Sequence, residues 1–486
     1  MISRSFFKSS LIYTIVGTLP YASGFFLIPW FTAYLTPSQF GINALFISLM
    51  YFIQILSSFG LDMSAGVLYF DYKDDKKRLG KFFGTVFIGL MISAAVIFIL
   101  FTLGGVRIFD ITFSGGNVLE LIPFGLFTII SGVFNGIFKT YSAILVNQQR
   151  PVRFFWINIF NFIFTVGGSL TILYLMPYTL FGPIVGRMIP AIVSASICLL
   201  LVKSEYGLQW ESANVRKIVN YTTPLMIYAL LIWVVSYIDR FIILRFMGDP
   251  TYVGIYDFGV KLVLGIELLL VGLVSTVNPK VYTIWKDQNL HGSTLEVNRY
   301  YNGLTAFILL LIPTFVILAP ILIPVVIKKE IYYQAFSLLT ILALGYASRI
   351  WFYMFLAPLM FFKRTKVLPR VFAISAFFEV IAAIFMIQWF GLMGAVWVNF
   401  MVKPLQALLL YFESRKIFHF KFNRWKIIYL PVIFMTVVIV SEIFITDQTR
   451  ILFHSGQLVV SIILVWFKFR HELVLLLKGM FIRFLS

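Results

Sequence analysis

The chain contains fourteen long apolar segments separated by short polar loops, and these segments account for most of its 486 residues. Hydrophobic residues make up 60% of the sequence and charged residues only 12%. A water-soluble domain with so little polar surface would aggregate, so this balance indicates that lipid is the main solvent of the chain. We therefore predict an all-α polytopic membrane protein.

Each apolar segment reaches about 20 residues, the length that an α-helix needs to cross a bilayer. The predicted membrane helices cover residues 11–33, 42–65, 82–104, 118–145, 153–175, 181–202, 222–246, 253–281, 302–327, 333–360, 368–389, 392–412, 427–446 and 451–468. No polar stretch between them is long enough to form a hydrophobic core of its own. Recognition and transport are therefore expected to share one membrane-embedded body.

The formal net charge of +19 reflects 39 Lys and Arg residues against 20 Asp and Glu. About 28 of these cations fall in alternate loops, which is the distribution that the positive-inside rule gives to cytoplasmic loops. Because the helix count is even, both termini are predicted to lie in the cytoplasm. A nucleic-acid-binding protein would gather its cations on one folded face, so the sequence argues against a nucleic-acid partner.

Three pairs of motifs recur about 210 residues apart, which indicates an internal repeat. The pairs are LTPSQFGINALF with MGDPTYVGIYDF, in which Gly41 and Gly254 match, VNQQRPVRFF with FFKRTKVLPR, and LFGPIVG with WFGLMGAVW. The pattern predicts two six-helix lobes in the same orientation around a central cavity, followed by two C-terminal helices. The predicted divisions are an N-lobe at 1–203, a cytoplasmic linker at 204–221, a C-lobe at 222–413, helices 13 and 14 within 414–468, and a cytoplasmic amphipathic tail at 469–486.

Residue types that carry catalysis or bind metals are sparse. The single cysteine, Cys198, lies in an apolar segment, and the four histidines are scattered without ligand spacing, so neither a disulfide framework nor a metal site is predicted. The sequence also has no Gly-rich phosphate-binding loop and no nucleophile elbow. We therefore predict that the protein is not an enzyme and needs no cofactor.

Charged side chains within the predicted spans are the best candidates for function, because each costs roughly 2.5 to 3.5 kcal/mol at the bilayer centre. Eleven such residues are Lys139, Arg187, Asp239, Arg240, Asp257, Lys261, Glu267, Arg349, Glu379, Lys403 and Glu442. A marginally stable protein cannot carry all of these charges unpaired. Most of them are therefore expected to be paired, snorkelling or solvated.

Position along the helices sorts these charges. Lys139 and Arg187 lie about six residues from a helix end, which favours snorkelling to the interface. Asp257 and Lys261 are four residues apart with the acid first, which favours an ion pair within one helix.

Adjacent charges on one helix give a different expectation. Asp239 and Arg240 are about 100° apart around the helix, so they are not expected to neutralise each other. Four further charges lie near mid-span, and cross-helix pairing among them is one alternative: Glu267, Arg349, Glu379 and Lys403.

The functional alternative is a cavity lined with cations. Arg presents a planar fork that suits phosphate oxygens, and Lys acts as a point charge, so such a cavity would attract an anionic head group such as a diphosphate. The candidate substrate-binding residues are Arg187, Arg240, Lys261, Arg349 and Lys403. The candidates for binding a coupling H⁺ or Na⁺ are Asp239, Glu267 and Glu379.

Four stretches of the sequence carry a family resemblance. They are LTPSQFGINALFISL, SSFGLD at Ser57–Asp62, YIDRFIILRFMGDPTYVGIYDFGVKL at Tyr237–Leu262, and FGLMGAVW at Phe390–Trp397. On these residues the chain resembles the Wzx-type polysaccharide flippases, which carry O-antigen and related lipid-linked oligosaccharides, within the multidrug/oligosaccharidyl-lipid/polysaccharide exporter superfamily. Helix count, length and repeat spacing extend the resemblance over essentially the whole chain.

The resemblance implies translocation of an undecaprenyl-diphosphate-linked oligosaccharide from the inner to the outer leaflet of a bacterial inner membrane, by alternating access and without ATP. It implies cavity cations that meet the diphosphate, which map onto Arg240 and Lys261, whereas Arg349 and Lys403 match no family motif. Membrane lipids, a polysaccharide polymerase and a chain-length regulator are the partners that such a flippase implies.

Three rival functions follow from the same features. A cation-coupled drug antiporter of the superfamily usually has twelve helices and an acidic cavity, whereas this chain has more bases than acids in mid-membrane. A lipid II flippase shares the fourteen-helix plan. A membrane polysaccharide polymerase or ligase would need a large extracytoplasmic loop with catalytic Arg or His, and the outer loops here are mostly very short.

Overall fold

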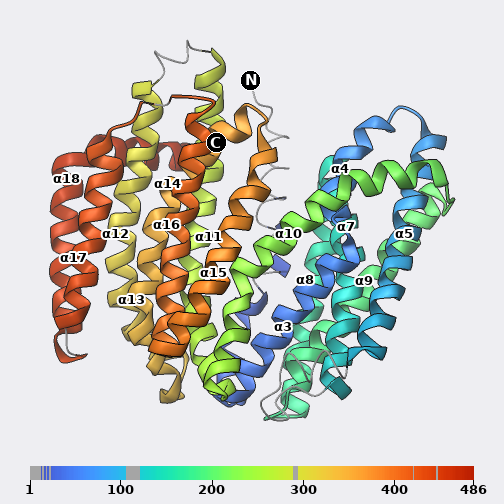
Figure 1. Ribbon diagram of the computed structural model, residues 1–486, viewed down its shortest axis with the longest axis horizontal. Helices are drawn as coiled ribbons and strands as arrows, with labels where there is room; N and C mark the ends of the chain where they lie inside the picture. Colours follow the sequence, from blue (N-terminus) through green and yellow to red (C-terminus); the bar gives the residue numbers. More distant parts are fainter. Residues whose placement is uncertain are drawn as a thin grey trace. The chain divides into compact units, whose positions relative to one another are not determined.

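The computed structural model describes residues 13, 16, 17, 19, 20, 23–105, 121–287, 294–419, 421–444 and 447–485. These residues form helices and include no strand (Figure 1). Among them, 13 helices are long and apolar enough to cross a membrane. The all-α membrane fold is thereby confirmed. The predicted helix at 11–33 and the start of the one at 118–145 lie partly outside the described residues.

The helices fall close to the predicted spans. In chain order they are α2 (Ile28–Tyr34), α3 (Pro37–Ser58), α4 (Leu61–Leu68), η1 (Tyr69–Asp71), α5 (Lys76–Leu103), η2 (Leu121–Gly125), α7 (Leu126–Asn147), α8 (Pro151–Leu175), α9 (Phe181–Tyr206), α10 (Ser212–Met247), α11 (Pro250–Asp287), α12 (Thr294–Val326), η3 (Glu330–Ala335), α13 (Phe336–Gly345), η4 (Tyr346–Ser348), α14 (Arg349–Phe361), η5 (Thr365–Val367), α15 (Leu368–Phe390), α16 (Leu392–Arg415), η6 (Trp425–Tyr429), α17 (Leu430–Phe444) and α18 (Asp447–Leu485).

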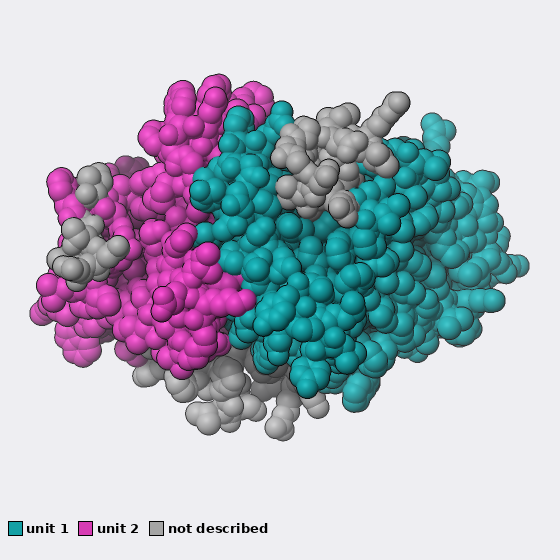
Figure 2. All heavy atoms as spheres, turned by 90° about the horizontal axis from the view of Figure 1, so that it is seen from below, with its two compact units in different colours: residues 1–255 teal, residues 256–486 magenta. Residues whose placement is uncertain are grey.

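The chain divides into two compact units, Met1–Ile255 and Tyr256–Ser486 (Figure 2). In the first unit α7 is central and packs against α3, α4, α5, α8 and α9. In the second unit α16 packs against α13, α14 and α15, while α18 lies along α12. The tail predicted at 469–486 continues α18 as far as Leu485. The lobe boundaries and the linker placed at 204–221 stay predictions.

The repeat seen in the sequence has a counterpart in backbone geometry. The loops after α7 and after α14 both turn on a residue with positive φ, Gln149 at 55° and Lys363 at 56°. The next amide in each loop, that of Arg150 and that of Arg364, donates to the carbonyl five residues earlier, at 3.0 and 2.8 Å. These two loops belong to matched motifs, so the same turn recurs at equivalent places in the two halves.

The matched glycines mark another shared feature. A Cβ built on Gly41 in α3 would fall against the carbonyl oxygen of Pro250, and one built on Gly254 in α11 would fall against that of Pro37. The first turns of α3 and α11 therefore cross in direct backbone contact, which only glycine permits at such a distance. The two repeat motifs thus pack against each other through the residue that they share.

A kink divides the span predicted at 42–65. It lies within one candidate membrane span, Pro37–Asp71, but α3 ends at Ser58 and α4 starts at Leu61. Phe59 and Gly60 between them have φ values of 49° and 71°, in the left-handed region. A helix cannot continue through this conformation, and glycine is the residue that adopts it at least cost. The span predicted at 333–360 is divided as well, because η4 separates α13 from α14.

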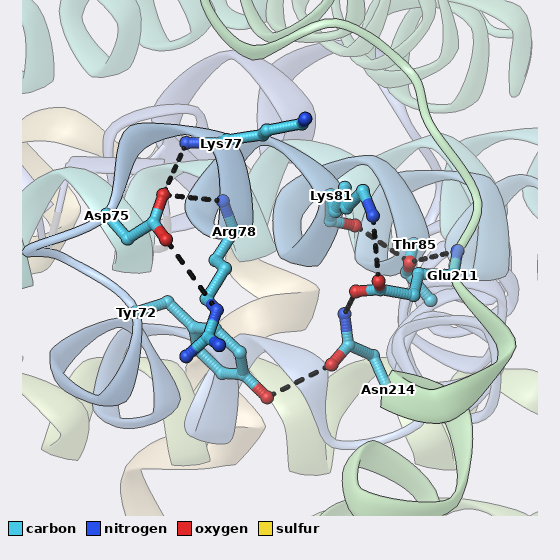
Figure 3. A network of polar contacts seen from close by, with 8 residues as sticks. All are labelled: Tyr72, Asp75, Lys77, Arg78, Lys81, Thr85, Glu211 and Asn214. Carbon is cyan, nitrogen blue, oxygen red and sulfur yellow. Dashed lines mark hydrogen bonds and ion pairs between the residues drawn. The ribbon is translucent and has the colours of Figure 1, made fainter.

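Polar contacts tie the start of α5 to the start of α10 (Figure 3). Asp75 caps α5 by accepting the backbone amides of the second and third residues after it, at 2.9 and 3.1 Å. The ammonium of Lys81 lies 3.0 Å from Glu211, and Tyr72 donates to Asn214 at 3.1 Å. These side-chain contacts therefore hold the start of α10 against α5 and the residues just before α5.

Replacing Gly254 or Gly41 with alanine is expected to lower the melting temperature of the detergent-purified protein. The new methyl group would push two helix backbones apart, and overpacking of this kind costs about 1–3 kcal/mol. Gly265 offers a matched control on α11, because a Cβ built there meets no described atom within 4 Å apart from its chain neighbours and its own helix backbone. Gly265→Ala is expected to leave the melting temperature unchanged or slightly higher. Equal melting temperatures for Gly254→Ala and Gly265→Ala would contradict the close crossing.

Candidate functional site

The first unit contains a polar cavity of about 240 Å³. It is lined by side chains of α3, α7, α8 and α9 together with residues that precede α2. The lining residues are Gly17, Pro20, Ser23, Met50, Tyr51, Gln54, Asn135, Phe138, Lys139, Ser142, Ala143, Val146, Phe154, Asn158, Asn161, Thr165 and Arg187. Amides, hydroxyls and two cations therefore share one cavity inside a membrane-embedded unit.

The polar wall of the cavity follows from helical spacing on α8. Asn158, Asn161 and Thr165 are three and four residues apart, so they lie on one face of the helix, and all three are buried. The amide of Asn158 donates to Ser142 on α7 at 3.0 Å, and the amide of Asn161 donates to Ser194 on α9 at 3.0 Å. Sequence reasoning that followed only charges missed these amides, although their spacing within 153–175 was visible.

Both cations of the cavity come from the predicted intramembrane charges. Lys139 on α7 was expected to snorkel, but its ammonium lies 3.0 Å from Asp62 on α4. Arg187 on α9 donates from Nη1 to the carbonyl of Pro183 at 2.8 Å, and its guanidinium lies 5.7 Å from the centre of the Phe31 ring. Both side chains line the cavity, with Lys139 37% exposed and Arg187 extending back toward the first turn of α9. That they snorkel to the interface stays a prediction.

The break between α3 and α4 places the partner of Lys139. Asp62 lies in the first turn of α4, where the helix dipole favours an acid, and its side chain is 8% exposed. Ser58, the last residue of α3, donates to the same carboxylate at 3.2 Å. The stretch SSFGLD therefore serves to bend the chain and to bring a carboxylate to α7.

Asp239 and Arg240 on α10 form an ion pair, contrary to the prediction. The Arg240 Nη1 atom lies 2.8 Å from Asp239 Oδ1 and donates to the carbonyl of Ser236 at 2.8 Å. Both side chains are buried, and the Tyr237 ring lies 5.2 Å from the guanidinium. The two side chains leave the helix about 100° apart, but the long Arg240 side chain folds back along its own helix and reaches the Asp239 carboxylate.

The expected pair of Asp257 and Lys261 on α11 is confirmed, with Nζ and Oδ2 2.6 Å apart. In low dielectric such a pair is strong, and its side chains are 4% and 17% exposed. Lys261 is therefore already balanced by an acid one helical turn away.

Arg349 joins three helices of the second unit. Its Nε atom lies 3.4 Å from Glu267 on α11, and its Nη1 donates to Gln406 on α16 at 3.1 Å. Tyr353, one turn further along α14, donates to the same Glu267 at 2.6 Å. Arg349 follows the tight 3₁₀ turn Tyr346–Ser348, which separates α13 from α14. Cross-helix pairing, the alternative considered for these mid-span charges, thus holds for Arg349 and Glu267.

Lys403 on α16 lies among polar and aromatic groups. Its ammonium donates to the carbonyl of Asn399 at 3.0 Å, also contacts the Asn399 side chain, and lies 4.9 Å from the centre of the Tyr346 ring. Glu379 is buried on α15, the helix that packs beside α16. The structure thus assigns Arg187, Asp239 and Arg240 to the first unit, and the other predicted site residues to the second.

A family model described as polysaccharide biosynthesis protein matches residues 6–282, which is more than half of the chain. The chain belongs to this family. A comparison with curated proteins gives no match. The resemblance found in the sequence is confirmed at this level.

Solved structures share the fold. The lipid II flippase MurJ in an inward closed conformation superposes with a TM-score of 0.72 at 15% identity, over 96% of this chain and 100% of that one. An inward-facing multidrug resistance MATE family transporter of the MOP superfamily gives a TM-score of 0.63 at 13% identity, over 85% of this chain and 98% of that one. This member of the polysaccharide biosynthesis family is therefore a multi-pass membrane protein with a fold found in flippases and transporters.

The Arg349–Glu267 contact predicts coupled effects on stability. Arg349→Gln or Glu267→Gln alone leaves one charge inside the protein without its partner, which costs about 3–5 kcal/mol for a fully buried pair and less here, because both side chains are about one-fifth exposed. The double variant is expected to lose less than the sum of the two, measured as unfolding in detergent. Tyr353→Phe is the control and removes only a hydrogen bond, worth about 1 kcal/mol. Additive losses would contradict the pair.

Proposed function

We propose that this protein translocates an undecaprenyl-diphosphate-linked oligosaccharide from the inner to the outer leaflet of the bacterial inner membrane by alternating access, for the synthesis of a surface polysaccharide such as O-antigen. Both termini lie in the cytoplasm in this proposal. The observation that carries it is the polar cavity of the first unit, in a chain that belongs to the polysaccharide biosynthesis family.

The chemistry of the cavity suits a glycan. Amide and hydroxyl groups act as both donors and acceptors, which is what sugar hydroxyls require. Arg187 supplies a guanidinium for a carboxylate or phosphate oxygen, and the rings of Tyr51 and Phe154 offer apolar faces. A volume of about 240 Å³ lies below the 300–1,000 Å³ that is usual for whole ligands, so the cavity would hold one sugar or one charged group of a larger substrate.

A lipid-linked substrate also needs an apolar surface, and the second unit has one. A cavity of about 560 Å³ lies among α12, α17 and α18. Its lining includes Leu309, Phe434, Leu452 and Val460 and is almost entirely apolar. This surface suits a polyprenyl chain, in the same way that the polar cavity of the first unit suits the glycan.

The remaining predicted residues keep their proposed roles. Arg240, Lys261, Arg349 and Lys403 are proposed to bind the substrate, and each would have to exchange a present partner for a substrate oxygen. Asp239, Glu267 and Glu379 are the proposed binding residues for a coupling H⁺ or Na⁺. A polysaccharide polymerase and a chain-length regulator are proposed as partners that take up the exported product.

Replacing Arg187, one of the two cations that line the cavity, should impair export. In a strain that lacks its chromosomal copy, a plasmid with Arg187→Ala is expected to give at least about tenfold less surface glycan, because a charge-assisted hydrogen bond is worth about 1.5–3 kcal/mol. Arg187→Lys keeps the charge without the fork and should restore part of the display. Surface glycan is measured by lectin or antibody labelling, and the protein level in the membrane by immunoblot.

Lys366→Ala serves as the control, because Lys366 is exposed in η5 and is not among the lining residues of this cavity. It should leave glycan display unchanged. Normal display with Arg187→Ala at a normal protein level would reject the role of the cavity. Loss of viability on deletion, with peptidoglycan precursors accumulating, would instead support the lipid II alternative.

A further inference from the structure

A second polar cavity lies at one end of the second unit, where α16 ends and the described loop residues 416–419 and 421–424 lead to η6 and α17. We name it the loop pocket. Its volume is about 280 Å³, and its lining includes Tyr411, Arg415, Phe418, Lys421 and Arg424. Arg415, Lys421 and Arg424 are exposed cations, so three positive charges surround a floor of aromatic rings.

The cations of the loop pocket are not neutralised by the acids closest to them. Glu413, two residues before Arg415, pairs with Lys416 at 2.7 Å, and Glu472 on α18 pairs with Lys426 at 2.5 Å. Arg415 itself donates to the hydroxyl of Tyr411 at 3.2 Å. Within the part of the chain that the structure describes, no carboxylate pairs with the three pocket cations. The pocket therefore carries net positive charge that an anion can neutralise.

The backbone is anchored at two points between Lys421 and Arg424. The Asn298 amide donates to the carbonyl of Lys421 at 2.8 Å, and its oxygen accepts the backbone amide of Asn423 at 3.0 Å. Phe418 is buried in edge-on contact with Trp285, with ring centres 5.7 Å apart. Anchoring at these points lowers the ordering cost of presenting Lys421 and Arg424 to a ligand.

The position of the loop pocket relative to the membrane indicates which kind of ligand it can reach. The loop pocket adjoins the ends of two helices that are long and apolar enough to cross a membrane, so it lies at the level of lipid head groups. A cluster of Arg and Lys at this depth attracts anionic lipids, and Arg forks match phosphate oxygens. The positive-inside rule explains the charges of a cytoplasmic loop but not an anchored backbone, an aromatic floor or a cavity.

We propose that the loop pocket binds the phosphate group of a lipid at the inner surface of the membrane. Two sources share this chemistry, an anionic phospholipid and the diphosphate of an incoming lipid-linked glycan. The second source rests on the proposed function, whereas binding of a lipid phosphate does not. The pocket is separate from the polar cavity of the first unit, with which it shares no residue.

The test measures binding of short-chain lipids to the detergent-purified full chain by thermophoresis. The probes are dihexanoyl phosphatidylglycerol, farnesyl diphosphate and the zwitterionic dihexanoyl phosphatidylcholine. The triple variant Arg415→Gln, Lys421→Gln, Arg424→Gln is expected to bind an anionic probe about tenfold more weakly or worse. The matched control Lys73→Gln, Lys76→Gln, Lys77→Gln removes three exposed cations from another basic loop and is expected to retain wild-type affinity.

Each outcome decides the proposal. Weaker binding of both anionic probes in the pocket variant alone supports it, and weaker binding of only one identifies the phospholipid or the diphosphate as the source. Equal losses in the two triple variants, no loss in the pocket variant, or equal affinity of the unmodified chain for the zwitterionic and anionic lipids would overturn it. Because binding is measured in detergent, failure of glycan export in cells leaves this result unaffected.

Discussion

Polar side chains inside a bilayer cannot form hydrogen bonds with water, so they must find partners within the protein. This requirement determines how the helices of this molecule contact one another. One cation on each of α7, α10, α11 and α14 lies beside a carboxylate of the chain itself: Lys139, Arg240, Lys261 and Arg349. Amides on α8 meet hydroxyls of the neighbouring helices. The hydrophobic effect does not drive helices together within lipid, so these polar contacts help to hold the helices in register.

The same requirement separates structural charges from functional ones. A pair such as Asp239 with Arg240 is buried and satisfied, and moving either partner toward a ligand means replacing a strong contact with another. Arg187, by contrast, lines a cavity and donates to a carbonyl, a weaker acceptor than a carboxylate. Of the five proposed substrate-binding cations, Arg187 is the one among the lining residues of this cavity. This position makes the polar cavity of the first unit the stronger candidate for glycan binding.

Much of the fold could be predicted from the sequence, because span length and repeat spacing depend on local composition. The pair of Asp257 with Lys261 was predictable for the same reason, since helical periodicity alone brings them together. Contacts between helices were harder. The meeting of Lys139 with Asp62 depends on a bend at Phe59 and Gly60 and on the rotation of α7, and neither follows from a run of apolar residues. The amides of the polar cavity went unnoticed because uncharged residues carry a weaker signal than charges.

The recurring turn at Gln149 and Lys363 bears on how the chain arose. Both residues are in the left-handed conformation although neither is glycine. This conformation costs roughly 1–2 kcal/mol for such residues, so a common origin explains the shared turn better than two independent origins. A segment that crosses the bilayer an even number of times begins and ends on one side. Copying it in tandem within one gene leaves every loop facing its original compartment. A tandem duplication of such a segment would therefore have required no inversion in the membrane, only a link between the two copies.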